Sequence, residues 1–336
     1  MDSLTQIVLG AAVGEAVLGK KVGNKALLYG AIAGTIPDLD VIFGNLTDTV
    51  TAIEWHRGFS HSILFCLLLS PLLGWLVNTI EPKYNLGWKP WAKLFFWGLF
   101  THPILDAFTT WGTQLFWPFD VRLAFNSIFV IDPLYTVPFL GCTILVLFQK
   151  RDSKKRTRLN RFGLIVSTFY LLFTVLLKTI VTSQFKEQLK HQNINYTAIS
   201  TRPSPMNTIL WNANIDTKEA YLIADYSFFD KNPIQFKRYP KNPELYSDVL
   251  KHEEVQRLIR ISNSWYIIEK NGRDWVFNDL RFGLIPRKDG TSFFAFSYQL
   301  NIVGNKLEVK EVPKTRGDAK FLLQNLWKRI KGNESN

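Results

Sequence analysis

Long apolar runs occupy the first half of the chain. Several approach the roughly 20 residues that a helix needs to cross the hydrocarbon core of a bilayer. One such run also fits a buried helix of a large soluble core, but several in one half of a chain favour a membrane domain. We therefore predict about five to six membrane helices, within the runs Leu4–Gly19, Ala26–Ile36, His61–Ile80, Trp91–Asp106, Ile128–Phe148 and Phe162–Thr182.

The second half of the chain has a different pattern. Short stretches alternate between apolar and polar residues, as half-buried strands do, and Asn271–Gly272 is a hairpin turn signal. Glu244–Ile261 and Asp318–Ile330 read as helices, the second basic and amphipathic. We predict an α-helical integral membrane domain over residues 1–184, followed by a soluble α+β domain rich in antiparallel strands over residues 185–336. The strand-like stretches are Glu219–Ser227, Ser264–Lys270, Trp275–Phe277 and Ser292–Tyr298.

The net charge of +12 gives information about the orientation of the helices in the membrane, and leaves the predicted elements unchanged. Much of the positive charge lies in Lys150–Arg161, between two apolar runs, where the positive-inside rule explains it better than nucleic-acid binding does. We expect no nucleic-acid partner, and phospholipid headgroups as the anionic neighbours. The two cysteines, Cys66 and Cys142, each lie inside an apolar run and indicate neither a disulfide framework nor a thiolate metal site.

Charge counting also predicts where the ionisable residues lie. If Lys150–Arg161 is cytoplasmic, the following run exits to the outside and the C-terminal domain is extracytoplasmic. Counting back along the chain places Pro37–Asp40, His56–His61 and Thr101–Asp106 at the outer ends of their helices. Ionisable groups in membrane segments are costly and usually functional. We therefore predict that these three runs form one site.

The histidines carry the first indication of metal chemistry. His102 and Asp106 are four residues apart, which places both side chains on one face of a helix. His56 and His61 are five apart and flank Gly58, so a loop-to-helix junction is expected there. Such a turn can direct both rings toward one ion or toward two neighbouring ions.

Carboxylates complete the predicted ligand set. Asp38 and Asp40 follow a helix-ending proline, where alternate residues of an extended segment share a face. A nitrogen and oxygen ligand set suits Zn²⁺, Mn²⁺ or Fe²⁺. We predict a divalent transition metal, Zn²⁺ first, as one ion or two. The predicted metal ligands are Asp38, His56, His61, His102 and Asp106.

This ligand set points to hydrolysis. Bound metal ions can activate water and clamp the oxygens of a phosphoester. Arg57 is the candidate for holding the anionic substrate or transition state, and Asp40 is a candidate catalytic carboxylate or further ligand. Asp132 is a candidate further ligand, or an acceptor for a ligand histidine. The expected substrate is a phosphoester, including a lipid or lipid-linked headgroup reached from the bilayer.

A family resemblance rests on these runs. The segments Met1–Gln6, Pro37–Asp40, His56–Ser62 and Thr101–Asp106 together resemble the YdjM-like family of membrane-bound metal-dependent hydrolases. The resemblance covers roughly residues 1–180 and implies a multi-pass protein of the bacterial cytoplasmic membrane. Many members carry a histidine where this chain has Gln6. The family is also distantly similar to zinc-dependent phospholipase C and nuclease P1, which implies phosphoester hydrolysis.

Two other functions remain open from the sequence. A proton- or ion-coupled transporter would use the histidines and aspartates as a relay, and would distribute ionisable residues through the depth of the helices. Glu15 is the main residue that fits that distribution. A non-enzymatic membrane scaffold would use its soluble domain to bind a partner.

Overall fold

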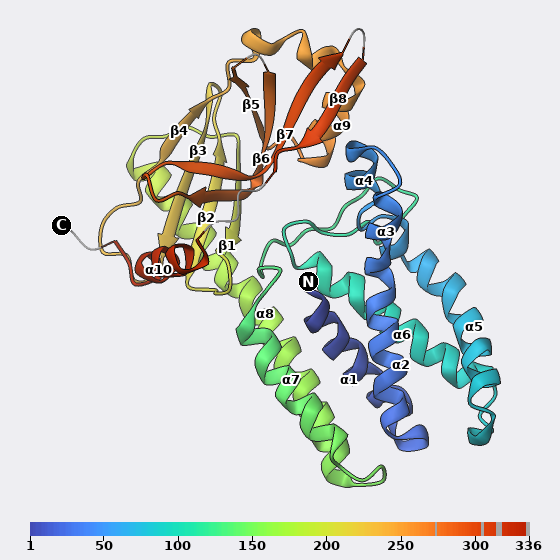
Figure 1. Cartoon of the computed structure of the whole chain (residues 1–336). Helices are drawn as coiled ribbons and strands as arrows, with labels where there is room; N and C mark the ends of the chain where they lie inside the picture. The colour runs from blue at the N-terminus through green and yellow to red at the C-terminus, as the bar shows by residue number, and fades with distance from the viewer. Residues whose placement is uncertain (273, 304–305, 314–317, 334–336) are drawn as a thin grey trace. The chain divides into compact units, whose positions relative to one another are not determined.

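A computed structural model of the chain describes residues 1–272, 274–303, 306–313 and 318–333 (Figure 1). The chain divides into two compact units. The first contains residues 1–43, 55–177 and 205–207, and the second contains residues 44–54, 178–204 and 208–336. The predicted domain of residues 185–336 therefore includes positions 273, 304–305, 314–317 and 334–336, which lie outside the described residues.

The first unit is built from helices. In chain order they are α1 (Ser3–Val22), α2 (Asn24–Thr35), η1 (Ile36–Leu39), α3 (Asp40–Gly44), η2 (Phe59–His61), α5 (Ile63–Ile80), η3 (Pro82–Tyr84), α6 (Trp88–Ala107), α7 (Pro133–Leu147) and α8 (Lys154–His191). The η elements are short 3₁₀ turns. Helix α8 is continuous across the boundary between the two units.

Glycines let α1 and α2 pack with their backbones in contact. A Cβ atom built on Gly10 would lie 2.3 Å from the Gly30 carbonyl oxygen, and one on Gly34 would lie 2.4 Å from the Gln6 carbonyl oxygen. Small residues allow this kind of close approach between helices in lipid. The structure thus places both Gly30 and Gly34 against α1.

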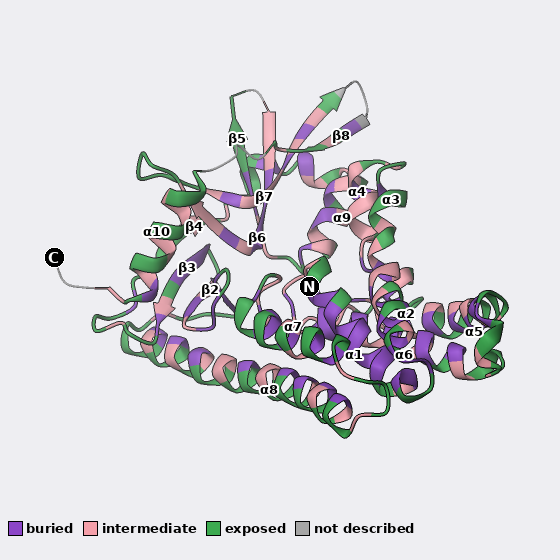
Figure 2. Ribbon diagram, turned by 60° about the horizontal axis from the view of Figure 1, so that its bottom comes forward, coloured by how far each residue is buried: buried purple, intermediate pink, exposed green. Residues whose placement is uncertain are grey.

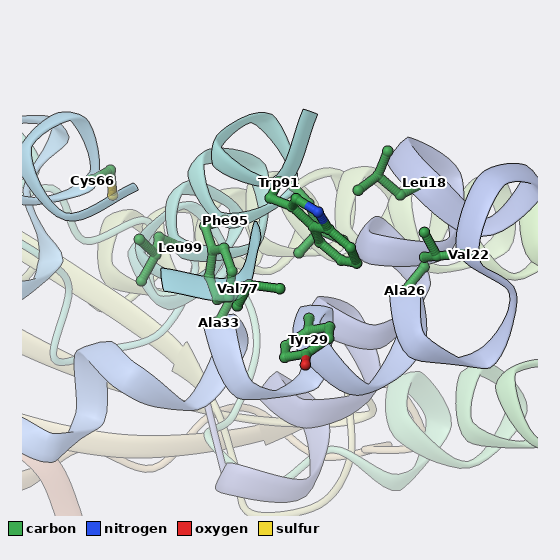
Figure 3. Packing of buried hydrophobic residues seen from close by; sticks show 11 residues of the cluster. Leu18, Val22, Ala26, Tyr29, Ala33, Cys66, Val77, Trp91, Phe95 and Leu99 are labelled. Atoms are coloured by element: carbon green, nitrogen blue, oxygen red, sulfur yellow. The ribbon is translucent and has the colours of Figure 1, made fainter. Parts of the chain in front are cut away.

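An aromatic cluster fills the other side of α2. Tyr29 packs edge-to-face on Trp91, with ring centroids 5.3 Å apart, and also contacts Phe95 (Figure 3). The Tyr29 hydroxyl donates to Glu81 Oε1 at 3.0 Å, so the polar end of this buried ring is satisfied. This cluster holds α2 against α6, the helix that carries His102.

Glu15 is explained by a buried ion pair. Arg156 of α8 donates from Nε to Glu15 Oε1 at 2.7 Å and from Nη2 to Glu15 Oε2 at 2.6 Å. Arg156 Nη1 also donates to the Asn24 side chain at 2.7 Å. A bidentate pair with further hydrogen bonds is the arrangement that a buried charge requires. Glu15 therefore has a structural partner within the helical unit.

Three described helices are long and apolar enough to cross a bilayer: Asn24–Gly44, Ile63–Ile80 and Lys154–His191. Helix α7 is apolar but shorter. The prediction of five to six membrane helices is therefore confirmed only as a helical region with three candidate spans among the described residues. Helices α5 and α8 expose much of their apolar surface, including Leu68 and Phe169 (Figure 2). Such exposure suits contact with lipid.

The second unit contains two antiparallel sheets of four strands each. The first has the order β1 (Ala198–Pro203), β2 (Leu210–Asp216), β3 (Ala220–Ser227) and β4 (Lys237–Pro240). The second has the order β5 (Tyr266–Asn271), β6 (Asp274–Pro286), β7 (Ser292–Val303) and β8 (Lys306–Glu311). The prediction of a C-terminal region rich in antiparallel strands is confirmed.

Local turn chemistry sets the hairpins of the second sheet. Gly272 has φ +64° in the turn between β5 and β6, and Gly290 has φ +82° in the turn between β6 and β7. Glycine adopts these angles without a steric cost. The remaining elements of this unit are α4 (Thr49–Trp55), η4 (Pro243–Tyr246), η5 (Val249–Lys251), α9 (Glu253–Ile261) and α10 (Ala319–Ile330). The predicted helix Glu244–Ile261 is thus divided into two 3₁₀ turns and a shorter α-helix.

Candidate metal centre

Four side chains from three chain segments meet in the helical unit. The turn η1 follows the end of α2; it begins at Ile36 and contains Pro37 and Asp38. His61 ends the turn η2. His102 and Asp106 lie one turn apart on α6. His61, His102 and Asp106 are fully buried, and Asp38 is partly buried.

The four potential ligand atoms all lie within 4.8 Å of one another. The two Nε2 atoms of His61 and His102 are 3.1 Å apart. Asp38 Oδ1 is 3.5 Å from His61 Nε2 and 3.3 Å from His102 Nε2. Asp106 Oδ2 is 3.5 Å and 3.7 Å from the same two nitrogens. A tetrahedral ion with bonds of 2.0–2.1 Å separates its ligands by about 3.3 Å. The five separations above lie near this spacing, so the four side chains could hold one metal ion.

The Nδ1 atoms of His61 and His102, which are not the candidate ligand atoms, each have a hydrogen-bond partner. His102 Nδ1 lies 2.6 Å from the Gly34 carbonyl oxygen, so it carries the proton and leaves Nε2 unprotonated. His61 Nδ1 lies 2.9 Å from the Ser60 hydroxyl oxygen and 3.7 Å from Asp40 Oδ2. Contacts of this kind fix the ring orientation of metal-binding histidines.

The surroundings of His61 favour positive charge. Burial by itself lowers the pKa of an imidazole. The carboxylates of Asp106 and Asp38 outweigh burial, and the pKa of His61 is raised above its ordinary value. The same carboxylates would stabilise a divalent cation held by these residues.

Asp106 supplies a further test of whether these residues suit a metal. Its Oδ1 atom accepts a hydrogen bond from Gln6 Nε2 at 2.9 Å and contacts the Met1 amino group. Its Oδ2 atom makes no hydrogen bond within the described part of the chain, although Arg57 Nε lies 3.0 Å away. A buried carboxylate oxygen without a hydrogen bond is costly. A metal ion at the point between the four ligand atoms would satisfy it.

Arg57 is tied into the site rather than exposed at its mouth. The residue has φ +59°, an unusual backbone conformation for a side chain other than glycine. Its backbone N–H donates to Asp40 Oδ2 at 2.8 Å, and its Nη1 donates to Thr109 Oγ1 at 2.9 Å. The strained turn thus allows one residue to hold Asp40 through its backbone and Asp106 through its side chain.

His56 and Asp40 lie outside the group of four. His56 Nδ1 is 3.4 Å from Asp40 Oδ1, and its ring centroid is 6.4 Å from that of His61. Asp40 Oδ2 accepts from the Ser60 hydroxyl at 3.2 Å. Asp40 therefore belongs to the hydrogen-bonded surroundings of His61, on the Nδ1 side of its ring. His56 contacts Asp40 and, between the described residues, forms no hydrogen bond with the four candidate ligands.

Asp132 is also separate from the four ligands. Its Oδ1 atom accepts from the backbone N–H groups of Leu134 and Tyr135, and its Oδ2 atom accepts from the Tyr170 hydroxyl at 2.9 Å. These bonds cap the N-terminus of α7. Asp132 therefore acts as a helix cap, not as the further ligand or histidine acceptor that its position suggested.

Two contributors to the site could not be found by sequence reasoning. Gly34 acts through its carbonyl oxygen and Thr109 through a hydroxyl, and neither has a sequence signal of its own. Gln6 differs from them, because its departure from the family pattern drew notice. The structure places its side chain against Asp106, next to the ligand group.

The helical unit can be assigned to a family. Residues 1–181 match the YdjM inner membrane protein family, which is more than half of the 336-residue chain. The chain belongs to this family. All four residues of the metal centre lie inside the matching YdjM region. The match confirms the resemblance drawn from the sequence motifs, while the distant similarity to phospholipase C and nuclease P1 stays a prediction.

A curated relative matches part of the chain. The uncharacterized protein YvsG of Bacillus subtilis (strain 168) is 32% identical over 101 residues, which is 28% of this chain and 58% of YvsG. The match thus covers somewhat more than half of the length of that relative. No solved structure matches the chain significantly.

Proposed function

We propose that the protein is a membrane-bound metal-dependent hydrolase that acts on a phosphoester. The observation that carries the proposal is the convergence of Asp38, His61, His102 and Asp106 at tetrahedral ligand spacing. With four protein ligands, water or substrate would enter as a fifth ligand of the ion, from the partly exposed side of Asp38. Zn²⁺ is the ion that this ligand set suits best.

Each residue has a defined task in this proposal. Asp38, His61, His102 and Asp106 would hold a divalent ion, which when bound supplies a Lewis acid for the phosphoryl group and lowers the pKa of a water molecule. Gly34 and Ser60 orient the two imidazoles. The positive charge of Arg57 keeps Asp106 ionised, and binding of the substrate phosphate by the same guanidinium stays a prediction. Asp40 holds the turn that carries His61.

A lipid or lipid-linked phosphoester is the substrate class that we favour. The candidate spans on either side of the centre expose apolar side chains such as Leu67 and Leu72 on α5. A substrate embedded in the bilayer can reach the site laterally from such a surface. The proposal also places α1, α6 and α7 in the membrane as a multi-pass bundle, with the centre and the second unit on the outer side.

Metal analysis of the purified full-length protein tests the proposal. We expect close to one equivalent of Zn²⁺ in the wild type and less than about one tenth of that in His102→Ala, because a ligand is lost. The matched control is His191→Ala, which removes an exposed histidine that only pairs with Glu187. A panel of phosphoester substrates, soluble and lipid-linked, should show turnover by the wild type and by His191→Ala only. Wild-type protein without transition metal, or full activity of His102→Ala, would contradict the proposal.

Sidedness has its own experiment. Reporter fusions after Asp48 and after Lys186 should both report an extracytoplasmic location. Cytoplasmic readouts at both points would invert the topology and would leave the metal centre itself unaffected.

A further inference from the structure

A short segment between two halves of the metal centre belongs to the second unit. Residues 44–54, here called the connecting segment, group with the second unit, while the residues before and after them group with the first. The segment contains α4, whose N-terminal turn is capped by Asp48 through a hydrogen bond from the Thr51 N–H at 3.0 Å. It follows Asp40 by four residues and precedes His56 by two.

The connecting segment is packed into a hydrophobic core. Val50 is only 1% exposed and lies in a cluster with Tyr246, Val249 and Leu258 of the second unit. Ile53 packs against the same cluster. A side chain buried to this extent is part of the core of the second unit rather than of a mobile loop.

Arg257 of α9 binds the same segment through polar contacts. Its Nη2 atom donates to Glu54 Oε2 at 2.6 Å and to Thr51 Oγ1 at 2.9 Å, and its Nε atom donates to Glu54 Oε2 at 3.1 Å. A guanidinium that bonds two side chains one turn apart on a helix fixes the rotation of that helix as well as its position. Glu54 is the last residue of the connecting segment, directly before Trp55 and His56.

The two ends of the segment are held together beside the metal ligands. His56 Nδ1 lies 3.4 Å from Asp40 Oδ1, and Asp40 Oδ2 accepts from the Arg57 N–H at 2.8 Å. Asp40 is two residues from Asp38, and Arg57 is four residues from His61. Only a few residues of chain therefore separate α4 from candidate ligands on both sides of the centre.

We propose that Arg257 is a positioning residue for the metal centre, which it adjusts through its contacts with Glu54 and Thr51 of the connecting segment. The inference rests on the proposed function, because it assumes that the four ligands bind a metal. It assigns a role to the second unit: that unit tunes the affinity and geometry of a site in the other unit. Arg257 touches neither metal nor substrate, so it acts through the Asp40 and His56 turn.

Metal affinity of the full-length protein tests this inference. Zn²⁺ titration against a competing chelator should give a dissociation constant about tenfold higher in Arg257→Met than in the wild type. This is the lower end of the effect of removing residues that orient metal ligands through hydrogen bonds. The d–d absorption of Co²⁺ in the same site should also change in intensity, because it reports ligand geometry. The double variant Glu54→Arg with Arg257→Glu exchanges the two charges and keeps the ion pair. It should restore the affinity for Zn²⁺ to within about threefold of the wild type.

The matched control is Arg238→Met, which breaks the exposed ion pair with Glu219 in the same unit. It should leave the affinity for Zn²⁺ unchanged. If Arg257→Met does not yield folded protein, Thr51→Val and Glu54→Gln each remove only part of the same contacts and should weaken binding about threefold. Wild-type affinity in all of these variants would overturn the inference, as would an equal loss in Arg238→Met. A wild type that binds no metal would instead overturn the proposed function.

Discussion

Two groups of buried ionisable residues, one in each unit, differ in how their charges are compensated. In the helical unit, Asp38, His61, His102 and Asp106 direct four donor atoms toward one point. In the second unit, Arg281 binds Asp279 with contacts of 2.7–3.2 Å, and Asp279 Oδ1 also accepts the Arg281 N–H at 2.9 Å. In the first group, Arg57 and the Met1 amino group pair with Asp106, and the four donor atoms still face one point that could hold a cation. The second group is completed by its own ion pair.

The difference shows that burial alone does not identify a functional site. Asp106 is 0% exposed and Asp279 is 2% exposed, so the two carboxylates are equally removed from solvent. Asp279 has a bidentate partner, whereas Asp106 Oδ2 has no hydrogen bond in the described part of the chain. Buried charges are retained either because they are paired or because they coordinate a ligand. The geometry of the donor atoms distinguishes these cases, and the following variants test that distinction.

The largest effect is expected for Asp38→Ala. Loss of one ligand should weaken Zn²⁺ binding by more than about 100-fold, because removing even residues behind the ligands costs 10–100-fold. In excess chelator, the free energy of unfolding should change by less than about 1 kcal/mol, since without metal the nearby Asp38 and Asp106 carboxylates repel each other. Chelator titration and thermal unfolding measure the two quantities. A large loss of stability with normal metal binding would make Asp38 a structural residue.

The opposite behaviour is expected for Asp279→Ala. The variant leaves Arg281 buried without its bidentate partner and should reduce the stability of the second unit by about 3 kcal/mol. Unfolding of the second unit can be followed by limited proteolysis of the full-length protein. Metal content should stay at the wild-type level. The double variant Asp279→Leu with Arg281→Met should recover part of the stability, because no unpaired charge remains; no recovery would contradict a self-compensating pair.

An intermediate effect is expected for Gly34→Ala. The added Cβ atom would lie 2.4 Å from the Gln6 carbonyl oxygen, so α1 and α2 must separate, at about 1–3 kcal/mol of stability. Because the Gly34 carbonyl oxygen also orients His102, Zn²⁺ affinity should fall by about tenfold. Gly141→Ala is the control, since a Cβ atom there meets no other described atom within 4 Å. Equal behaviour of the two variants would show that the close packing is unimportant.

The smallest effect is expected for Gln6→Ala. It removes one hydrogen bond to Asp106 Oδ1, which is worth about 1 kcal/mol or a few-fold in Zn²⁺ affinity. The same chelator titration resolves a change of this size. A loss as large as that of Asp38→Ala would mean that Gln6 itself belongs among the ligands.

The sequence was most informative where local spacing sets direction. His102 and Asp106 share a helix face because they are four apart, and Pro37 places Asp38 at the end of α2 because proline disrupts the helix. His61 was also included correctly in the converging group. The same reasoning could not separate His61 from His56, since the left-handed turn at Arg57 decides which ring enters the site.

The number of candidate spans was a weaker prediction. Apolar content alone suggested five to six membrane helices, but the polar residues of α1 and α6 serve contacts inside the helical unit. Glu15 illustrates this, because its partner Arg156 is 141 residues away in the chain. Hydropathy cannot reveal such a pairing, since it is summed over neighbouring residues only.

The sequence by itself determined a helical membrane region, a strand-rich C-terminal region, the family and four residues of the candidate metal group, because each depends on composition or on spacing over a few residues. Only the tertiary structure decided that Gly34 and Ser60 orient the histidines, that Arg57 contacts Asp106, and that residues 44–54 pack into the core of the second unit. These contacts join backbone groups and side chains far apart in the chain. Their formation depends on how helices pack, which no local pattern encodes.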